Sequence, residues 1–189
     1  GKKLGRGTFG VAYKVVDTYC DLPRAIKIIT EDRSSLMERM KQEYRALANV
    51  PEHPRIVRLL DGNLLQPVGF PYLVFDYVEG TDVRELIDAK KLSLPEAVQM
   101  GLQVAEGLVH LHQHGVTHGD IKPSNLLWTE LGVKIFDFNV AVRAADGPAS
   151  GGGSRKYLPP DFDPMIEATE LERQDRDLYA LGVTLYEAV

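Results

Sequence analysis

The sequence has few of the features that mark secreted, membrane-spanning or nucleic-acid-binding proteins. Its one cysteine, Cys20, cannot form an internal disulfide and fits a reducing compartment. No apolar run is long enough to span a bilayer, and no signal-peptide pattern opens the chain. Basic side chains (22) are fewer than acidic ones (27), whereas a general nucleic-acid binder needs a positive face. We therefore expect a cytoplasmic protein with no membrane segment in this chain and no nucleic-acid partner.

What is present is the composition of a folded domain, with 44% hydrophobic and 26% charged residues. The first part predicts strands at 11–17 and 24–30 around a turn at 21–23, then a helix at 34–49. Two more strands are expected at 56–60 and 71–77, around a turn near 61–63. The pattern indicates a strand-rich lobe that ends at a linker near 76–82.

The second part is predicted to be mainly helical. Residues 93–96 spell a capping box, Ser-x-x-Glu, which opens a helix to about residue 114. Its apolar positions recur at helical spacing: Val98, Leu102, Ala105, Leu108 and Val109. Short strands are expected at 125–128 and 133–136, a mobile Gly-, Ala- and Ser-rich loop at 143–154, and a buried helix at 177–189. The fold class is therefore α+β.

Residues 5–10 form a Gly-x-Gly-x-x-Gly motif. In a dinucleotide-binding fingerprint this motif opens a helix, because the pyrophosphate sits at the helix N-terminus. Here the glycines lead into strand-like residues 11–16, which favours a glycine flap between two strands whose amides can approach phosphates. On this motif alone, three glycines in an ordinary turn remain an alternative.

Lys27 and Glu43 are candidates for a buried ion pair. Lys27 lies in an apolar strand, and Glu43 lies on an apolar helix face. That face is formed by Leu36, Met40, Glu43 and Leu47. A buried carboxylate needs a partner, and Lys27 is the obvious one. The alternative is an exposed helix edge, with Glu43 bonded to Arg39 or Lys41.

The strongest segment is 118–125, His-Gly-Asp-Ile-Lys-Pro-Ser-Asn. It brings a carboxylate, an ammonium group and an amide together in Asp120, Lys122 and Asn125. Phosphoryl transfer needs such groups to orient a hydroxyl, hold a phosphate and bind a metal. A second acid, Asp137, follows a short strand and is suited to Mg²⁺. Either segment could be a polar loop by chance, but both together make that interpretation weak.

In this order, these residues resemble the eukaryotic-type protein kinases over essentially all 189 positions. The resemblance implies a two-lobed fold, with an antiparallel sheet and one helix in the N-lobe and hinge (1–78). A mainly helical C-lobe (79–189) would be incomplete, since the chain stops inside the central helix. Residues 153–161 resemble the end of an activation segment, and Asp177 would support the backbone of the catalytic loop.

The resemblance also implies catalytic roles. Lys27 would hold the α- and β-phosphates of ATP, and Glu43 would hold Lys27 in place. Asp120 would orient the substrate hydroxyl and accept its proton, while Lys122 would neutralise the γ-phosphate. The Lys-Pro-Ser-Asn run at 122–125 is similar to the serine/threonine branch, so the implied partner is a protein bearing serine or threonine.

The cofactors implied by the resemblance are ATP and Mg²⁺. The metal would be held by Asn125 and Asp137. The implied nucleotide contacts are the phosphate-covering Gly5, Gly7 and Gly10, the adenine pocket of Ala12, Ala25, Phe75 and Leu127, the hinge residues Asp76 and Val78, and Asp82 at the ribose.

Four positions depart from the family pattern. Gly119 replaces an arginine that pairs with a phosphate on the activation segment, so we expect loop phosphorylation not to be the main switch; phosphatase treatment tests this. Asn139 replaces a glycine after Asp137, and Asn is suited to the positive φ expected there. Ala12 replaces a valine above adenine, and Asp161 replaces a glutamate.

Two other functions remain open from the sequence. His118, Gly119 and Asp120 are similar to the catalytic motif of aminoglycoside kinases, which act on small molecules. A pseudokinase, which binds nucleotide or partners without catalysis, is the other alternative. The complete set of catalytic residues argues against the second, and the segment 154–161 argues against the first. The oligomeric state is left open.

Overall fold

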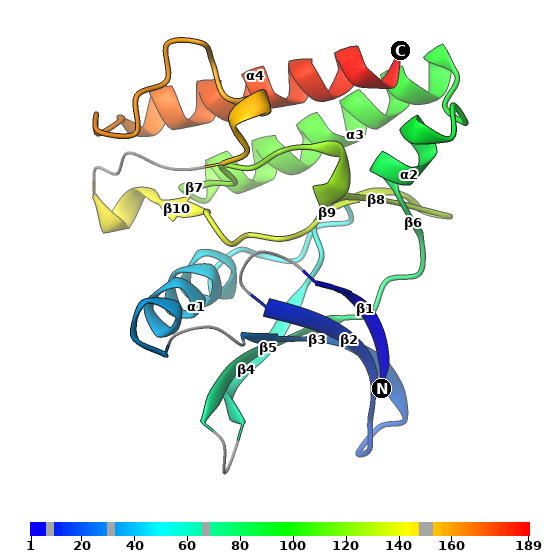
Figure 1. Ribbon diagram of the computed structural model, residues 1–189, viewed down its shortest axis with the longest axis vertical. Coiled ribbons are helices and arrows are strands. Elements are labelled where there is room, and N and C mark those ends of the chain that lie inside the picture. The colour runs from blue at the N-terminus through cyan, green and yellow to red at the C-terminus, as the bar shows by residue number, and fades with distance from the viewer. Residues whose placement is uncertain (7–9, 30–32, 66–68, 148–152) are drawn as a thin grey trace.

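The computed structural model describes residues 1–6, 10–29, 33–65, 69–147 and 153–189, without the side chains of 33–39 and 64–65 (Figure 1). Five antiparallel strands form one sheet in the order β1-β2-β3-β5-β4. They are β1 (Lys2–Arg6), β2 (Gly10–Asp17), β3 (Leu22–Ile29), β4 (Leu59–Leu65) and β5 (Phe70–Asp76). Helix α1 (Arg33–Ala48) packs against β4 and β5. The predicted α+β class is confirmed.

Two turns predicted from the sequence are wrong. The β2–β3 turn covers residues 18–21, and β3 already begins at Leu22. Asp21 closes the turn, because its φ is 54° and its N–H donates to the Asp17 carbonyl at 2.8 Å. Residues 61–63 lie within β4. A Cβ at Gly62 would come within 2.7 Å of Leu73 and 2.9 Å of Tyr44, so this glycine permits close packing inside the sheet.

The rest of the chain is built around three helices, α2 (Val83–Asp88), α3 (Leu94–Gln113) and α4 (Glu170–Ala188). Figure 1 shows α3 and α4 running side by side. The short elements between them are β6 (Thr81–Asp82), β7 (Val116–Thr117), η1 (Pro123–Asn125), β8 (Leu126–Thr129), β9 (Gly132–Ile135), β10 (Val142–Arg143), η2 (Ala144–Asp146) and η3 (Arg155–Tyr157). Strands β6, β8 and β9 form one small sheet, and β10 pairs with β7.

The long helix α3 begins where its capping box predicts. The Glu96 carboxylate accepts from the Ser93 N–H at 2.8 Å. Among the apolar positions that predicted this helix, Val98, Leu102 and Val109 are each more than half exposed. The buried face is formed by Ala97, Met100, Gly101, Val104, Gly107, Leu108 and Leu111. Apolar residues occur on both faces of α3, so periodicity alone could not choose between them.

Helix α4 begins at Glu170, earlier than predicted, behind a second capping box. The Thr169 N–H donates to the Glu172 carboxylate at 2.7 Å. The prediction that the helix is buried all round is also wrong, since Leu178 and Tyr186 are exposed. Among the described residues, no helix is both long and apolar enough to cross a membrane.

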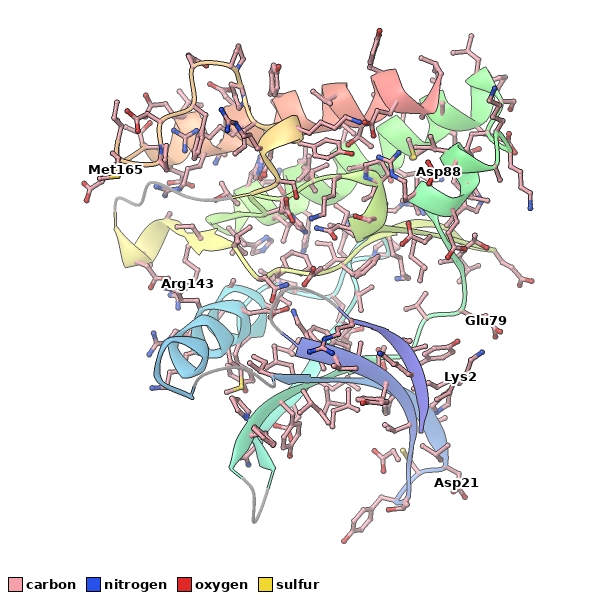
Figure 2. All side chains as sticks on the ribbon, in the orientation of Figure 1. Lys2, Asp21, Glu79, Asp88, Arg143 and Met165 are labelled. Atoms are coloured by element: carbon pink, nitrogen blue, oxygen red, sulfur yellow. The ribbon has the colours of Figure 1, made fainter. Side chains whose placement is uncertain are left out.

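A connecting segment and an isolated β-bridge are among the links between the two parts of the molecule. Residues 77–80 have no regular structure, and Figure 2 shows Glu79 on this connection. Ile56 pairs with Ile135, whose N–H donates to the Arg55 carbonyl at 2.8 Å. Because Ile135 ends β9, this bridge holds the segment that carries Asp137 next to the five-stranded sheet.

Candidate active site

Lys27 and Glu43 form the ion pair expected from the sequence. Strand β3 carries Lys27, and its Nζ lies 2.8 Å from each carboxylate oxygen of Glu43 on α1. Only 1% of Glu43 is exposed, so the alternative of a solvent-exposed helix edge is wrong. Met40 and Leu47 are buried on the same helix, while the side chain of Leu36 lies outside the description.

A third charge completes this group, since the Lys27 Nζ donates to Asp137 Oδ1 at 2.9 Å. Burial alone would lower the pKa of Lys27, but the charges of Glu43 and Asp137 outweigh it and hold that pKa above its ordinary value. Burial raises the pKa of Glu43, and the Lys27 charge opposes this rise. Lys27 is therefore a positively charged group held between two acids from α1 and from the segment after β9.

The turn after β9 differs from the expectation for Asn139. The positive φ belongs to Asp137, at 65°, and not to Asn139. Asn139 instead uses its side chain: Oδ1 accepts from the Lys27 Nζ at 2.6 Å, and Nδ2 donates to Asp137 Oδ1. Phe138 between them is buried against the ring of His118, with 4.7 Å between ring centroids. The backbone can place its strained residue at Asp137 because aspartate also tolerates this region.

The segment 118–125 brings its three polar groups together as predicted. The Lys122 Nζ donates to Asp120 Oδ2 at 2.5 Å. The Asn125 Nδ2 donates to the Asp120 carbonyl at 2.8 Å and to Oδ2 at 3.1 Å. Ser154, near the end of the loop that follows β10, donates its N–H to Asp120 Oδ1 at 2.7 Å and accepts from Lys122 at 2.8 Å. Sequence reasoning did not identify Ser154 as a site residue, because it lies 34 residues from Asp120.

These contacts keep Asp120 ionised. Burial would raise its pKa, but hydrogen bonds and charge from Lys122, together with the Ser154 amide, hold the pKa of Asp120 below its ordinary value. A carboxylate in this state can accept a hydrogen bond from a hydroxyl at neutral pH. Chemically, the loop offers one acceptor beside one ammonium group.

The loop backbone is anchored by Asp177 from α4, which is 1% exposed. Its carboxylate accepts from the N–H groups of His118 at 2.9 Å and Gly119 at 2.8 Å, and it hydrogen-bonds His112 Nε2 at 2.9 Å. Gly119 has a φ of 78°, and a Cβ there would lie 3.0 Å from the Val140 carbonyl oxygen. A side chain at this position would therefore be strained by the positive φ and by the close approach of Val140.

We expect Asp177→Ala to destabilise the fold by at least about 3 kcal/mol, because several buried donors lose their acceptor at about 1–3 kcal/mol each. Urea unfolding followed by circular dichroism measures the change. Asp175→Ala, at an exposed position of the same helix, is the matched control. Equal unfolding free energies for the two variants would show that the carboxylate does not support the loop.

The glycine motif is only partly described. Gly5 lies in β1 and Gly10 opens β2, while Gly7 falls outside the described residues. A Cβ at Gly10 would lie 2.3 Å from the Ile28 carbonyl oxygen, so close approach of β3 requires glycine there. A Cβ at Gly5 would meet nothing within 4 Å. The prediction that these glycines cover phosphates stays a prediction.

The residues expected around adenine lie on neighbouring strands. Ala12 on β2 pairs with Lys27, and Ala25 on β3 pairs with Phe75 on β5. Asp76 ends β5, where its carboxylate forms an ion pair with Arg24 at 2.5 Å. The structure thus brings Ala12, Ala25 and Phe75 next to the strand position of Lys27. Their contact with a nucleotide remains a prediction.

Three more expected nucleotide contacts, Val78, Asp82 and Leu127, lie where the irregular segment 77–80 leads into β6 and α2. Val78 is in the irregular segment 77–80, and Leu127 on β8 pairs with Asp82. Asp82 caps α2, accepting from the Arg84 N–H at 2.7 Å, and burial raises its pKa above the ordinary value. A Cβ at Gly80 would lie 2.5 Å from the Trp128 carbonyl oxygen, so the connection passes close to β8.

The candidate metal ligands are oxygen donors, as a hard cation such as Mg²⁺ prefers. The Asn125 amide nitrogen is directed to Asp120, which leaves its amide oxygen as an acceptor. Asp137 is 27% exposed and presents a carboxylate. Within the described parts of the chain, no three His, Cys, Asp or Glu residues gather into a metal site. Two protein ligands nevertheless fit Mg²⁺, which takes its other ligands from phosphates and water.

A second polar network, missed by sequence reasoning, ties the region after Ser154 to the helices. The Tyr157 hydroxyl on η3 donates to Glu187 of α4 at 2.8 Å, and Arg84 of α2 donates to that hydroxyl at 2.7 Å. Arg84 and Lys156 both form ion pairs with Glu187. The sequence signal was limited to the charges of Arg84, Lys156 and Glu187, and such charges are ordinary on a surface.

Comparisons with known proteins find serine/threonine-protein kinases that match nearly the whole chain. A probable serine/threonine-protein kinase of Streptomyces coelicolor is 32% identical over 99% of this chain and 29% of its own length. The calcium/calmodulin-dependent protein kinase type II of Caenorhabditis briggsae is 35% identical over 98% of this chain and 35% of its own. For serine/threonine-protein kinase PknK of Mycobacterium tuberculosis the values are 32%, 98% and 17%.

This chain therefore spans about a third, or less, of the length of these relatives. The model of the family described as protein kinase domain matches residues 1–189. By this match over its whole length, the chain belongs to the protein kinase family.

Proposed function

We propose that this chain acts as a serine/threonine-protein kinase domain, which transfers the γ-phosphate of ATP to a serine or threonine hydroxyl of a protein. The observation that carries the proposal is the meeting of Lys27, Glu43 and Asp137 from three separate segments. The names of relatives that cover the whole chain support the same activity.

The nucleotide would lie between the sheet and the catalytic loop, in the part of the molecule where β3 faces the segment after β9. Lys27 would bind the α- and β-phosphates, under the glycines Gly5, Gly7 and Gly10. The adenine ring would contact Ala12, Ala25, Phe75 and Leu127, with hinge contacts to Asp76 and Val78 and a ribose contact to Asp82. We place the boundary between the lobes at residues 78–79, on the irregular connection.

Asn125 and Asp137 would hold Mg²⁺, which neutralises phosphate charge when bound. Asp120 would bind the substrate hydroxyl and accept its proton, since its carboxylate is ionised. Lys122 would hold the transferred phosphoryl group, and its bonds to Asp120 and Ser154 support this role because they hold it beside the proposed base. Positioning and charge stabilisation of this kind supply most of the rate in phosphoryl transfer.

Phosphate transfer tests the proposal directly. Purified chain is incubated with Mg²⁺ and γ-labelled ATP, once with a mixture of unstructured proteins and once with aminoglycosides or choline. We expect label on serine and threonine of the proteins, with Asp120→Asn as the inactive control. Label on the small molecules alone would favour a small-molecule phosphotransferase. Nucleotide binding without any transfer would favour a pseudokinase.

A further inference from the structure

Asn139 links two residues to which the proposed function assigns different ligands, Lys27 to the nucleotide phosphates and Asp137 to Mg²⁺. Its Oδ1 lies 2.6 Å from the Lys27 Nζ, and its Nδ2 donates to Asp137 Oδ1. The same Asp137 oxygen accepts from Lys27 at 2.9 Å. The three side chains therefore form a closed ring of hydrogen bonds, which we call the Asn139 clamp.

Together with Glu43, the clamp fully occupies the Lys27 ammonium group. An ammonium group has three hydrogens, and the Lys27 Nζ lies within hydrogen-bond distance of four oxygens, two from Glu43 and one each from Asp137 and Asn139. A phosphate can gain a strong bond to this nitrogen only if another acceptor leaves. The carboxylate of Asp137 is also partly occupied, because its Oδ1 accepts from both Lys27 and Asn139.

The amide of Asn139 is suited to this double contact, because it is both an acceptor and a donor. An aspartate at 139 could accept a hydrogen bond from Lys27 but would repel the Asp137 carboxylate. An alanine could neither accept from Lys27 nor donate to Asp137. The clamp does not serve the backbone turn, since the positive φ lies at Asp137. Alanine at 139 therefore removes the amide without introducing positive-φ strain.

We propose that Asn139 is a positioning residue that holds Lys27 and Asp137 to each other when no nucleotide is bound, and so lowers the affinity of the site for nucleotide phosphates. The inference rests on the proposed function, because it assigns the phosphates to Lys27. Asn139 acts through the other two residues and does not touch the reacting atoms.

The first test compares Asn139→Ala with the parent by calorimetric titration of ADP, once in EDTA and once with Mg²⁺. We expect roughly three- to tenfold tighter binding in both conditions, as one charge-assisted hydrogen bond no longer competes with phosphate. Asn49→Ala, at an exposed position, is the matched control and should bind as the parent does.

The second test needs no nucleotide. The Lys27 amine is acylated with a small amine-reactive ester, and the modified peptide is quantified by mass spectrometry against exposed Lys91 as the internal reference. Asn139→Ala should raise the acylation rate of Lys27 several-fold, because the amide oxygen that lies 2.6 Å from the Lys27 nitrogen no longer blocks the approach of the reagent. A merely structural role would not change this ratio in a folded variant.

Each outcome decides the matter. Weaker Mg²⁺–ADP binding with unchanged binding in EDTA would make Asn139 a metal ligand and overturn the clamp, as would unchanged binding in both conditions. If the parent binds no nucleotide, the proposed function fails. The acylation rate of Lys27 then still tests whether the Asn139 clamp exists. An unchanged acylation rate overturns the clamp in either case.

Discussion

Asp120→Asn is expected to lower the rate of phosphate transfer by about a thousandfold, within the range that general base catalysis contributes. The carboxylate is held ionised by Lys122 and the Ser154 amide, so it is ready to take the hydroxyl proton. An amide of the same shape cannot accept a proton. Nucleotide affinity should stay close to that of the parent, because the ion pair of Lys27 lies on a different segment. Transfer rate and ADP affinity, measured on the same sample, check both statements.

Asp175→Asn is the control for this variant, since it makes the same change at an exposed position of α4. It should transfer phosphate at the parent rate. If Asp120→Asn were as active as the parent, Asp120 would not be the base, and the role assigned to the whole segment 118–125 would be lost. If parent and variant were equally inert while ADP bound to both, the protein would be a pseudokinase.

Lys27→Met should destabilise the fold by about 3–5 kcal/mol, because it leaves a buried carboxylate without its cation. Glu43 is 1% exposed and has both oxygens bonded to Lys27. The methionine also removes the ammonium group that we propose to bind phosphates, so phosphate transfer should fall together with ADP affinity. Urea unfolding measures the first effect, and titration of ADP measures the second.

Glu43→Gln is the comparison that separates the two effects. Lys27 keeps Asp137 and Asn139 as partners in that variant, so the loss of stability should be smaller than for Lys27→Met. Joining the two changes as Lys27→Met with Glu43→Leu should recover part of the stability, since an apolar pair replaces a broken ion pair. Equal losses for both single variants would contradict this account of the pair.

Some parts of the fold follow from local chemistry and could be predicted. The capping box at Ser93 and the strand that carries Lys27 depend on neighbours in the chain. The Lys27–Glu43 pair was also predictable, because a carboxylate in an apolar helix face requires a nearby cation. The segment 118–125 presented its polar groups within eight residues, and the structure gathers them.

Other parts depended on packing between distant segments. Val98 and Leu108 both lie at apolar positions of α3, yet only Leu108 meets the core. The residues around Gly62 are typical of a turn, but Gly62 lies inside β4. It packs there against Tyr44 and Leu73, which belong to other elements. Local propensity could not detect these neighbours.

The sequence alone determined which groups this protein possesses: a lysine in an apolar strand and a carboxylate on an apolar helix face, a polar loop at 118–125, a glycine motif and a capping box at Ser93. Each of these features is visible in a short stretch of the chain. The tertiary structure decided which groups meet, for example Ser154 with Asp120 and Asn139 with Lys27, which are 34 and 112 residues apart. Contacts between residues so far apart in the chain depend on how separate elements pack. The hydrogen-bonding capacity of a side chain does not determine which residue becomes its partner.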